Sequence, residues 1–125
     1  MDEFSSAYRL PNGERIKTGA LWVIAEKWEH DANVGRVDAL RWKWDCNFKL
    51  DFDGTLGPWK IISRFYPPHY NGGNGWDGAI SVYTSDEPET VAVGEFPVKA
   101  DDLADLVRKV DEAIAAIKQR YGVKP

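Results

Sequence analysis

Two carboxylates, Asp51 and Asp53, are the residues of this chain whose types and spacing best suit chemistry. They follow a run of alternating apolar and polar residues and precede Gly54, so they lie near the end of an expected strand. Two carboxylates in that position can share a hard cation while one of them attacks phosphorus. The pair therefore indicates metal-assisted phosphoryl transfer as the first chemistry to consider.

The segment from Asp51 to Leu56 resembles the first motif of haloacid-dehalogenase-type phosphotransferases. The resemblance implies a nucleophile at Asp51, a general acid/base at Asp53 and Mg²⁺ beside both. In that family the motif ends a parallel strand buried on both faces, which reads as a continuous apolar run. Here Asn47 and Lys49 alternate with apolar residues before the motif, and only one strong helix pattern follows it. The sequence therefore favours a strand-end turn, with a Mg²⁺-dependent phosphatase as a remote alternative.

The other reactive side chains form no catalytic or metal-binding pattern. His30 and His69 are far apart, with no cysteine or second histidine at ligand spacing. The single cysteine, Cys46, shares a predicted strand face with aromatic residues and is interpreted as a small buried hydrophobe. The glycine-rich segment 72–75 lacks the lysine and hydroxyl residue of a phosphate-binding loop. We therefore expect no enzyme activity, no metal and no cofactor.

The elements that must position these residues indicate one α+β domain over residues 1–125, an antiparallel sheet of about five strands closed by one C-terminal amphipathic helix. Residues 1–19 are expected to form an N-terminal arm, 20–98 the sheet and 101–121 the helix. Strands are predicted at 20–29, 40–52, 59–66, 79–84 and 90–96 from β-forming residues and period-two alternation.

Breaks and caps follow from turn chemistry. The alternating stretch 40–52 is long for one strand, so we expect a bulge or hairpin break near Cys46. The segments 53–58 and 85–88 are predicted turns, and 69–78 a glycine-rich loop. Asp101 is the expected helix N-cap, and one apolar stripe should cover a sheet face; its residues are Leu103, Leu106, Val107, Val110, Ile114, Ile117 and Tyr121.

Composition adds an unusual aromatic content, with six Trp, five Tyr and five Phe in 125 residues. The net charge of −4 argues mildly against a phosphate-rich partner, although residues 36–70 carry a basic excess. The N-terminus has no signal-peptide pattern and no apolar run is long enough to span a membrane, so we expect a cytoplasmic protein without membrane contact.

Protein binding is the function that these features favour most. Trp and Tyr are enriched at interface hot spots, and the predicted loop displays His69, Tyr70, Trp76 and Asp77. The prediction is a small non-enzymatic protein-binding module, such as an inhibitor, immunity-type or accessory protein of bacterial or phage style.

Binding of single-stranded nucleic acid is the alternative. Strand parity would gather basic and aromatic side chains on one sheet face, namely Arg41, Lys43, Lys49, Lys60, Arg64 and Tyr66. Basic groups track phosphates while rings stack on bases. Several antiparallel strands followed by one helix are also similar to Whirly-type and positive-cofactor-type single-stranded DNA-binding modules. The sequence does not identify the partner and leaves open whether the chain forms a homodimer.

Overall fold

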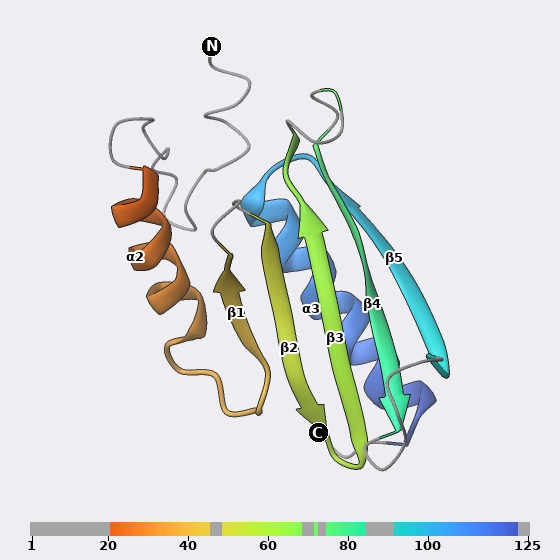
Figure 1. Ribbon diagram of the computed structural model, residues 1–125. Coiled ribbons are helices and arrows are strands. Elements are labelled where there is room, and N and C mark those ends of the chain that lie inside the picture. Colours follow the sequence, from red (N-terminus) through yellow and green to blue (C-terminus); the bar gives the residue numbers. More distant parts are fainter. Residues whose placement is uncertain (1–20, 46–48, 69–71, 73–74, 85–91, 123–125) are drawn as a thin grey trace.

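The computed structural model describes residues 21–45, 49–68, 72, 75–84 and 92–122. Five antiparallel strands lie side by side in chain order, β1 (Arg41–Trp44), β2 (Leu50–Leu56), β3 (Trp59–Tyr66), β4 (Trp76–Thr84) and β5 (Gly94–Ala100). Helix α3 (Leu103–Arg120) lies behind the sheet, and helix α2 (Leu21–Asn33) lies beside β1 (Figure 1). The predicted α+β class, with an antiparallel sheet and a C-terminal helix, is confirmed.

Helix α2 corrects the prediction of a first strand at Ala20–Glu29. The segment is rich in β-forming residues, but Ala25, Trp28 and Ala32 recur at helical spacing and turn one face toward the core. Trp28 is fully buried, and its ring makes edge contacts with Trp42 and Trp44 at centroid distances of 5.7 and 5.6 Å. Burial of this large side chain outweighs the local β propensity.

The alternating stretch from residue 40 to 52 divides into β1 and β2, which confirms the predicted break near Cys46. Trp44 pairs with Leu50, and the backbone N–H of Asp45 donates to the carbonyl of Lys49 at 3.0 Å. Residues 46–48, Cys46 included, lie outside the described residues. The apolar members of both strands face the helices, among them Trp42 and Phe52, whose rings are 4.5 Å apart.

The predicted boundaries of the next elements need correction. The segment 53–58 is not a single turn, because β2 continues through Leu56 and only Gly57-Pro58 forms the connection. Gly54 has φ = 153°, and a Cβ there would overlap the backbone carbonyl of Ala39, so glycine lets the chain pass closely. Strand β4 begins at Trp76 rather than at residue 79, and β5 spans Gly94–Ala100 rather than 90–96. The predicted turn at 85–88 lies outside the described residues.

Helix α3 covers one face of the sheet as its apolar stripe predicts. Leu103, Leu106, Val110, Ile114 and Ile117 are buried, while Val107 and Tyr121 pack against the core from its margin. The N-cap is Asp102 instead of Asp101, because the Asp102 carboxylate accepts the N–H of Asp105 at 2.8 Å. The sheet therefore spans residues 41–100 and the helix 103–120, in place of the predicted 20–98 and 101–121.

Both outer edges of the sheet are protected against pairing with another strand. At the β1 edge, the Asn33 amide accepts the N–H of Trp42 at 2.8 Å and donates to its carbonyl at 2.9 Å. Glu29 of the same helix accepts the N–H of Trp44 at 2.8 Å. At the other edge, Pro97 in β5 has no N–H to offer. Unpaired backbone groups are what an edge strand presents to an incoming strand, so α2 and Pro97 remove that route.

The Asn33 clamp predicts a specific loss of stability. Replacing Asn33 by Ala removes both hydrogen bonds to β1 and leaves half-buried backbone groups of Trp42 unpaired, which should lower the free energy of unfolding by about 1–3 kcal/mol. Asp31→Ala on the same helix removes only exposed contacts, to Lys27 and to His30, and should cost at most about 0.5 kcal/mol. Urea denaturation measures both; equal effects would show that Asn33 does not hold the edge.

Candidate functional site

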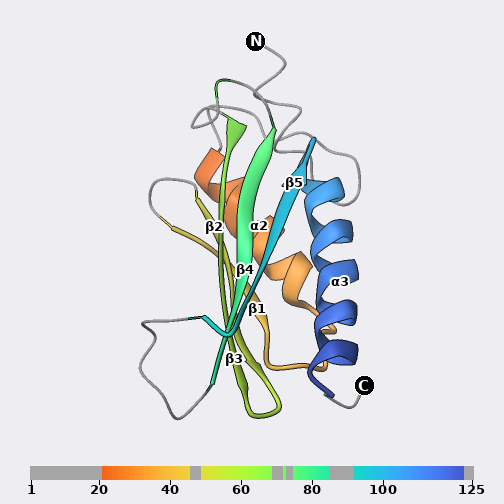
Figure 2. The ribbon, with the colours of Figure 1, turned by 90° about the vertical axis from the view of Figure 1, so that its right-hand side faces the viewer.

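The face of the sheet turned away from α3 is the candidate functional site, and we call it the open face. Figure 2 shows α3 on one side of the strands only, and no helix among the described residues covers the other side. Side chains of alternate strand positions form this face. On β1 to β3 they are Arg41, Lys43, Asp51, Asp53, Thr55, Lys60, Ile62, Arg64 and Tyr66, and on β4 and β5 they are Asp77, Ala79, Ser81, Tyr83, Glu95, Pro97 and Lys99.

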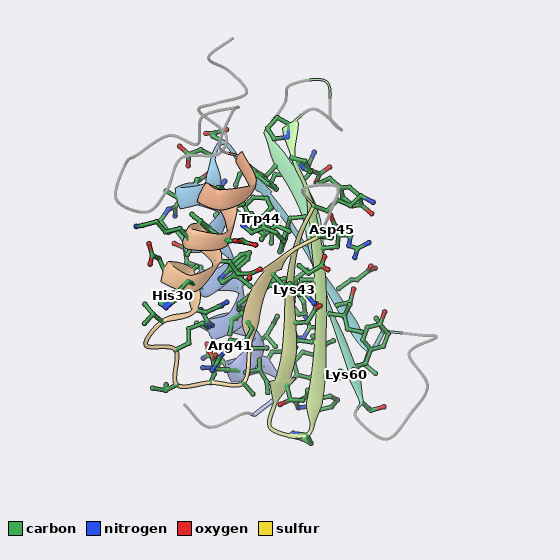
Figure 3. The ribbon with its side chains drawn as sticks, turned by 60° about the vertical axis from the view of Figure 1, so that its left-hand side comes forward. His30, Arg41, Lys43, Trp44, Asp45 and Lys60 are labelled. Atoms are coloured by element: carbon green, nitrogen blue, oxygen red, sulfur yellow. The ribbon has the colours of Figure 1, made fainter. Side chains whose placement is uncertain are left out.

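The predicted basic and aromatic residues do share this face. One row across the sheet runs from Lys43 through Asp51 to Arg64, as the strand register pairs them. The neighbouring row contains Lys49, whose ammonium lies 5.6 Å from the centre of the Tyr66 ring. In Figure 3, Arg41, Lys43 and Asp45 follow one another along the β1 side of the sheet, whereas Trp44 points back toward α2.

Acidic side chains interleave with the basic ones, so the open face has no single sign of charge. The Arg64 guanidinium donates to both oxygens of Asp51, at 2.8 and 3.1 Å, and a nitrogen of the same group lies 3.9 Å from Asp45. The hydrogen bond from Arg64 to Asp51, partly opposed by burial, raises the pKa of the guanidinium and keeps it charged. The Arg41 guanidinium lies 3.8 Å from the Asp38 carboxylate and donates to the backbone carbonyls of Asp38 and Leu40, both at 2.7 Å. Much of the basic charge is therefore neutralised within the protein.

A shallow groove of about 420 Å³ runs over β3 and β4 on the open face. Its floor contains the small side chains of Ala79 and Ser81 beside Ile62, and its walls include Arg64, Tyr66 and Asp77. Tyr66 is 38% exposed, and it pairs in register with Asp77. Two sets of predicted residues thus meet here, since Arg64 and Tyr66 come from the nucleic-acid hypothesis and Asp77 from the protein-binding hypothesis.

Trp76 is not on this surface, contrary to the prediction that a loop displays it. It begins β4, is fully buried, and its ring lies 5.9 Å from that of Trp44. The prediction failed because Trp76 follows a glycine-rich segment that reads as loop, whereas its side chain takes the core-facing position of the strand. His69 and Tyr70 lie outside the described residues.

Several residues of the open face were not singled out from sequence. Ala79, Ser81, Glu95, Pro97 and Lys99 belong to it because β4 and β5 continue the two-residue alternation of the central strand. Extending the parity of β3 into those strands could have found them. The obstacle was the misplaced start of β4 and the end of β5, because a strand boundary must be known before its parity can be assigned.

The two carboxylates of the phosphotransferase-like motif also lie on the open face, within antiparallel β2 rather than at the end of a parallel strand. This contradicts the setting that the resemblance implies. Asp51 is held by Arg64, and Asp53 accepts the backbone N–H of Ser63 at 2.9 Å. Burial, together with the charge of Asp51 and against the hydrogen bond from Ser63, raises the pKa of Asp53. Among the described residues, no group of three or more His, Cys, Asp or Glu side chains is arranged to hold a metal ion.

A second groove, of about 510 Å³, lies between α3 and the α2–β1 connection. Its polar groups already bind one another. Arg36 donates to both oxygens of Asp38, at 3.1 and 2.9 Å, and stacks 4.8 Å from the centre of the Phe52 ring. Burial raises the pKa of Asp38, but the hydrogen bonds from Arg36 and Leu40 outweigh it and leave the pKa below its ordinary value. This cluster anchors the connection, so the open face is the stronger candidate.

No protein-family model matches this chain, and neither a curated protein nor a solved structure shows a match to it. Neither of the helices that the structure describes is long and apolar enough to cross a bilayer. The open face is therefore the feature from which we infer the function of this chain.

The raised pKa of Asp53 predicts a pH-dependent effect of Asp53→Asn. A carboxyl whose pKa is raised by folding contributes stability that is lost as the pH rises from its unfolded value of 3.8 through its folded value. The asparagine lacks this loss but can still accept the Ser63 N–H, so its stability relative to wild type should improve between acidic and neutral pH. Urea denaturation at several pH values measures the difference.

Asp53→Ala is the control for the hydrogen bond. It removes the acceptor and should lower the free energy of unfolding by about 1–3 kcal/mol at neutral pH. A pH-independent difference between Asp53→Asn and wild type would contradict the assigned pKa direction.

Proposed function

We propose that this protein is a small non-enzymatic protein-binding module, of inhibitor or accessory type, that recognises its partner with the open face of the sheet. The observation that carries the proposal is the groove over β3 and β4, a floor of small and apolar side chains walled by Arg64, Tyr66 and Asp77. Stable protein interfaces share this plan, with an apolar centre surrounded by a polar rim.

The protected edges disfavour one mode of binding, the addition of a partner strand to the sheet. Addition of a partner strand needs free backbone groups at an edge, and α2 occupies those of Trp42 and Trp44 while Pro97 interrupts the opposite edge. Recognition by backbone pairing is therefore disfavoured at both edges. The side chains of the open face supply the contacts instead.

Tyr66 and Arg64 are the expected anchors of this interface. Tyrosine and arginine are enriched among residues that dominate binding energy. The Arg64 guanidinium is already oriented by Asp51, so binding need not order it, and Tyr66 offers an amphipathic ring with Lys49 over one side. A partner that fills the groove would contact both residues together.

The distribution of charge separates this proposal from nucleic-acid binding. A phosphate backbone attracts a face of one sign, because affinity arises chiefly from cations that replace counterions. Here Asp45, Asp51 and Asp53 stand among the basic residues, and Arg64 is paired. A protein partner can match both signs at once.

Site-specific photo-crosslinking tests the proposal. Benzoylphenylalanine at Ala79, on the groove floor, should give a discrete protein adduct in the native cells, whereas the same residue at Ala116, on the outer side of α3, should not. Tyr66→Ala or Arg64→Ala should reduce the Ala79 adduct by about tenfold or more. If neither position gave an adduct, or if both gave the same one, the open face would not be the binding surface.

The competing nucleic-acid hypothesis makes the opposite prediction for a labelled oligothymidine. We expect fluorescence anisotropy to show no saturation of the oligonucleotide up to about 100 µM protein at physiological salt. Such an affinity is weaker than the usual range of non-specific binders. Micromolar binding that falls steeply with salt and disappears in Lys43→Glu and Lys60→Glu would contradict the proposal. Lys27→Glu, on α2 and away from the open face, is the matched control.

A further inference from the structure

In two of the rows that cross the open face, those of Ile62 and Tyr66, residues of opposite charge lie at equal distances on the two sides of the central strand β3. In the row of Ile62, the register leads through Ser81 to Glu95 on β5. On the other side, the pairs Asp51–Arg64 and Gly54–Ile61 place Asp53 opposite Ile62, and Asp53 pairs with Arg41 on β1. In this row the two outer strands therefore carry opposite charges.

The row of Tyr66 repeats this arrangement twice. Lys49 lies on its β2 side and Asp77 on its β4 side, and further out Asp45 is balanced by Lys99. Three pairs of opposite charge are thus related by reflection across β3.

We propose that the partner of the open face is a second copy of this chain, packed face to face about a two-fold axis that runs along β3; this inference rests on the proposed function of that face. Rotation about this axis places β1 of one copy over β5 of the other, and β2 over β4. Each row keeps its position along the strand direction. Arg41 of one copy then faces Glu95 of the other, Asp45 faces Lys99, and Lys49 faces Asp77. The interface is isologous and closed, as in most homodimers.

The residues on the axis suit contact with their own copies. Ile62 meets Ile62 at the middle of β3, and the Tyr66 rings meet at the end of the strand. Arg64 also lies on the axis, but its charge is offset by Asp51 and Asp45 of the same chain. Lys60, the second residue of β3, lies near the other end of the axis, where its long side chain can extend toward solvent.

The dimensions of the face are adequate for a dimer. The five strands contain 35 residues, and at about 3.3 Å by about 4.8 Å each these cover roughly 550 Å² before side-chain relief is added. A typical stable interface buries about 800 Å² on each partner. Side-chain relief brings the open face close to that size.

Light scattering coupled to gel filtration is the first test. At about 100 µM the protein should have twice its chain mass of 14.1 kDa. Glu95→Arg places like charge opposite Arg41 of the other copy and should raise the dimer dissociation constant by about tenfold. Arg41→Glu combined with Glu95→Arg should restore it. These two residues lie on opposite outer strands of one chain, so coupling between them requires a second copy.

Chemical crosslinking gives a second readout that does not depend on charge. In a Cys46→Ser background, Ile62→Cys lies on the axis and should join two copies through a short bis-maleimide. Val37→Cys is a stringent control, because Val37 is 103% exposed but lies on the α2–β1 connection, away from the open face. Dimer formation at position 62 and not at position 37 is the expected result.

A monomeric mass together with no crosslink at position 62 would overturn the homodimer. The photo-crosslink from Ala79 then decides about the proposed function separately. An adduct whose mass exceeds that of two copies, or a heterologous adduct, would leave the open face as a binding surface for another protein while removing the second copy as its partner. If no adduct formed either, the proposed function would fail with the inference.

Discussion

The packing of Trp28 against Trp42 and Trp44 is the interaction on which the rest of this structure depends. It draws α2 onto β1, where Asn33 and Glu29 then occupy the free backbone groups of that strand. The same packing commits the apolar positions of the first hairpin to one face, because side chains in a strand alternate. Once that face is chosen, the alternate residues of each of the five strands are assigned to the open face.

The open face combines features that would be unusual for a surface serving only solubility. Small residues such as Ala79 and Ser81 line a groove, and exposed Tyr66 stands beside a guanidinium held in place by Asp51. Charges of both signs alternate across the strands, which stabilises the sheet through cross-strand pairs and also provides a pattern that a complementary surface can read. Because both edges are blocked, the proposed recognition depends on that pattern.

The glycine residues of the sheet contribute by close approach rather than by flexibility. Gly54 lets β2 pass the carbonyl of Ala39, and Gly78 leaves room for the ring of Phe65, since an added Cβ would collide with both. These close approaches place β2 against the residues that precede β1 and place β4 against β3. The core thereby sets the geometry of the surface opposite it.

The sequence alone determined the fold class, the α3 stripe, the hairpin break near Cys46 and the shared face of Lys43, Arg64 and Tyr66, because period-two and helical periodicities are local properties of the chain. Prediction from sequence failed at residues 20–29 and at Trp76. There the local propensity competed with burial of a tryptophan, which is favourable only once the core has assembled. The pairing of Arg64 with Asp51 and the balance of Arg41 against Glu95 depend on strand register. Register is fixed by contacts between distant segments, so only the tertiary structure could decide it.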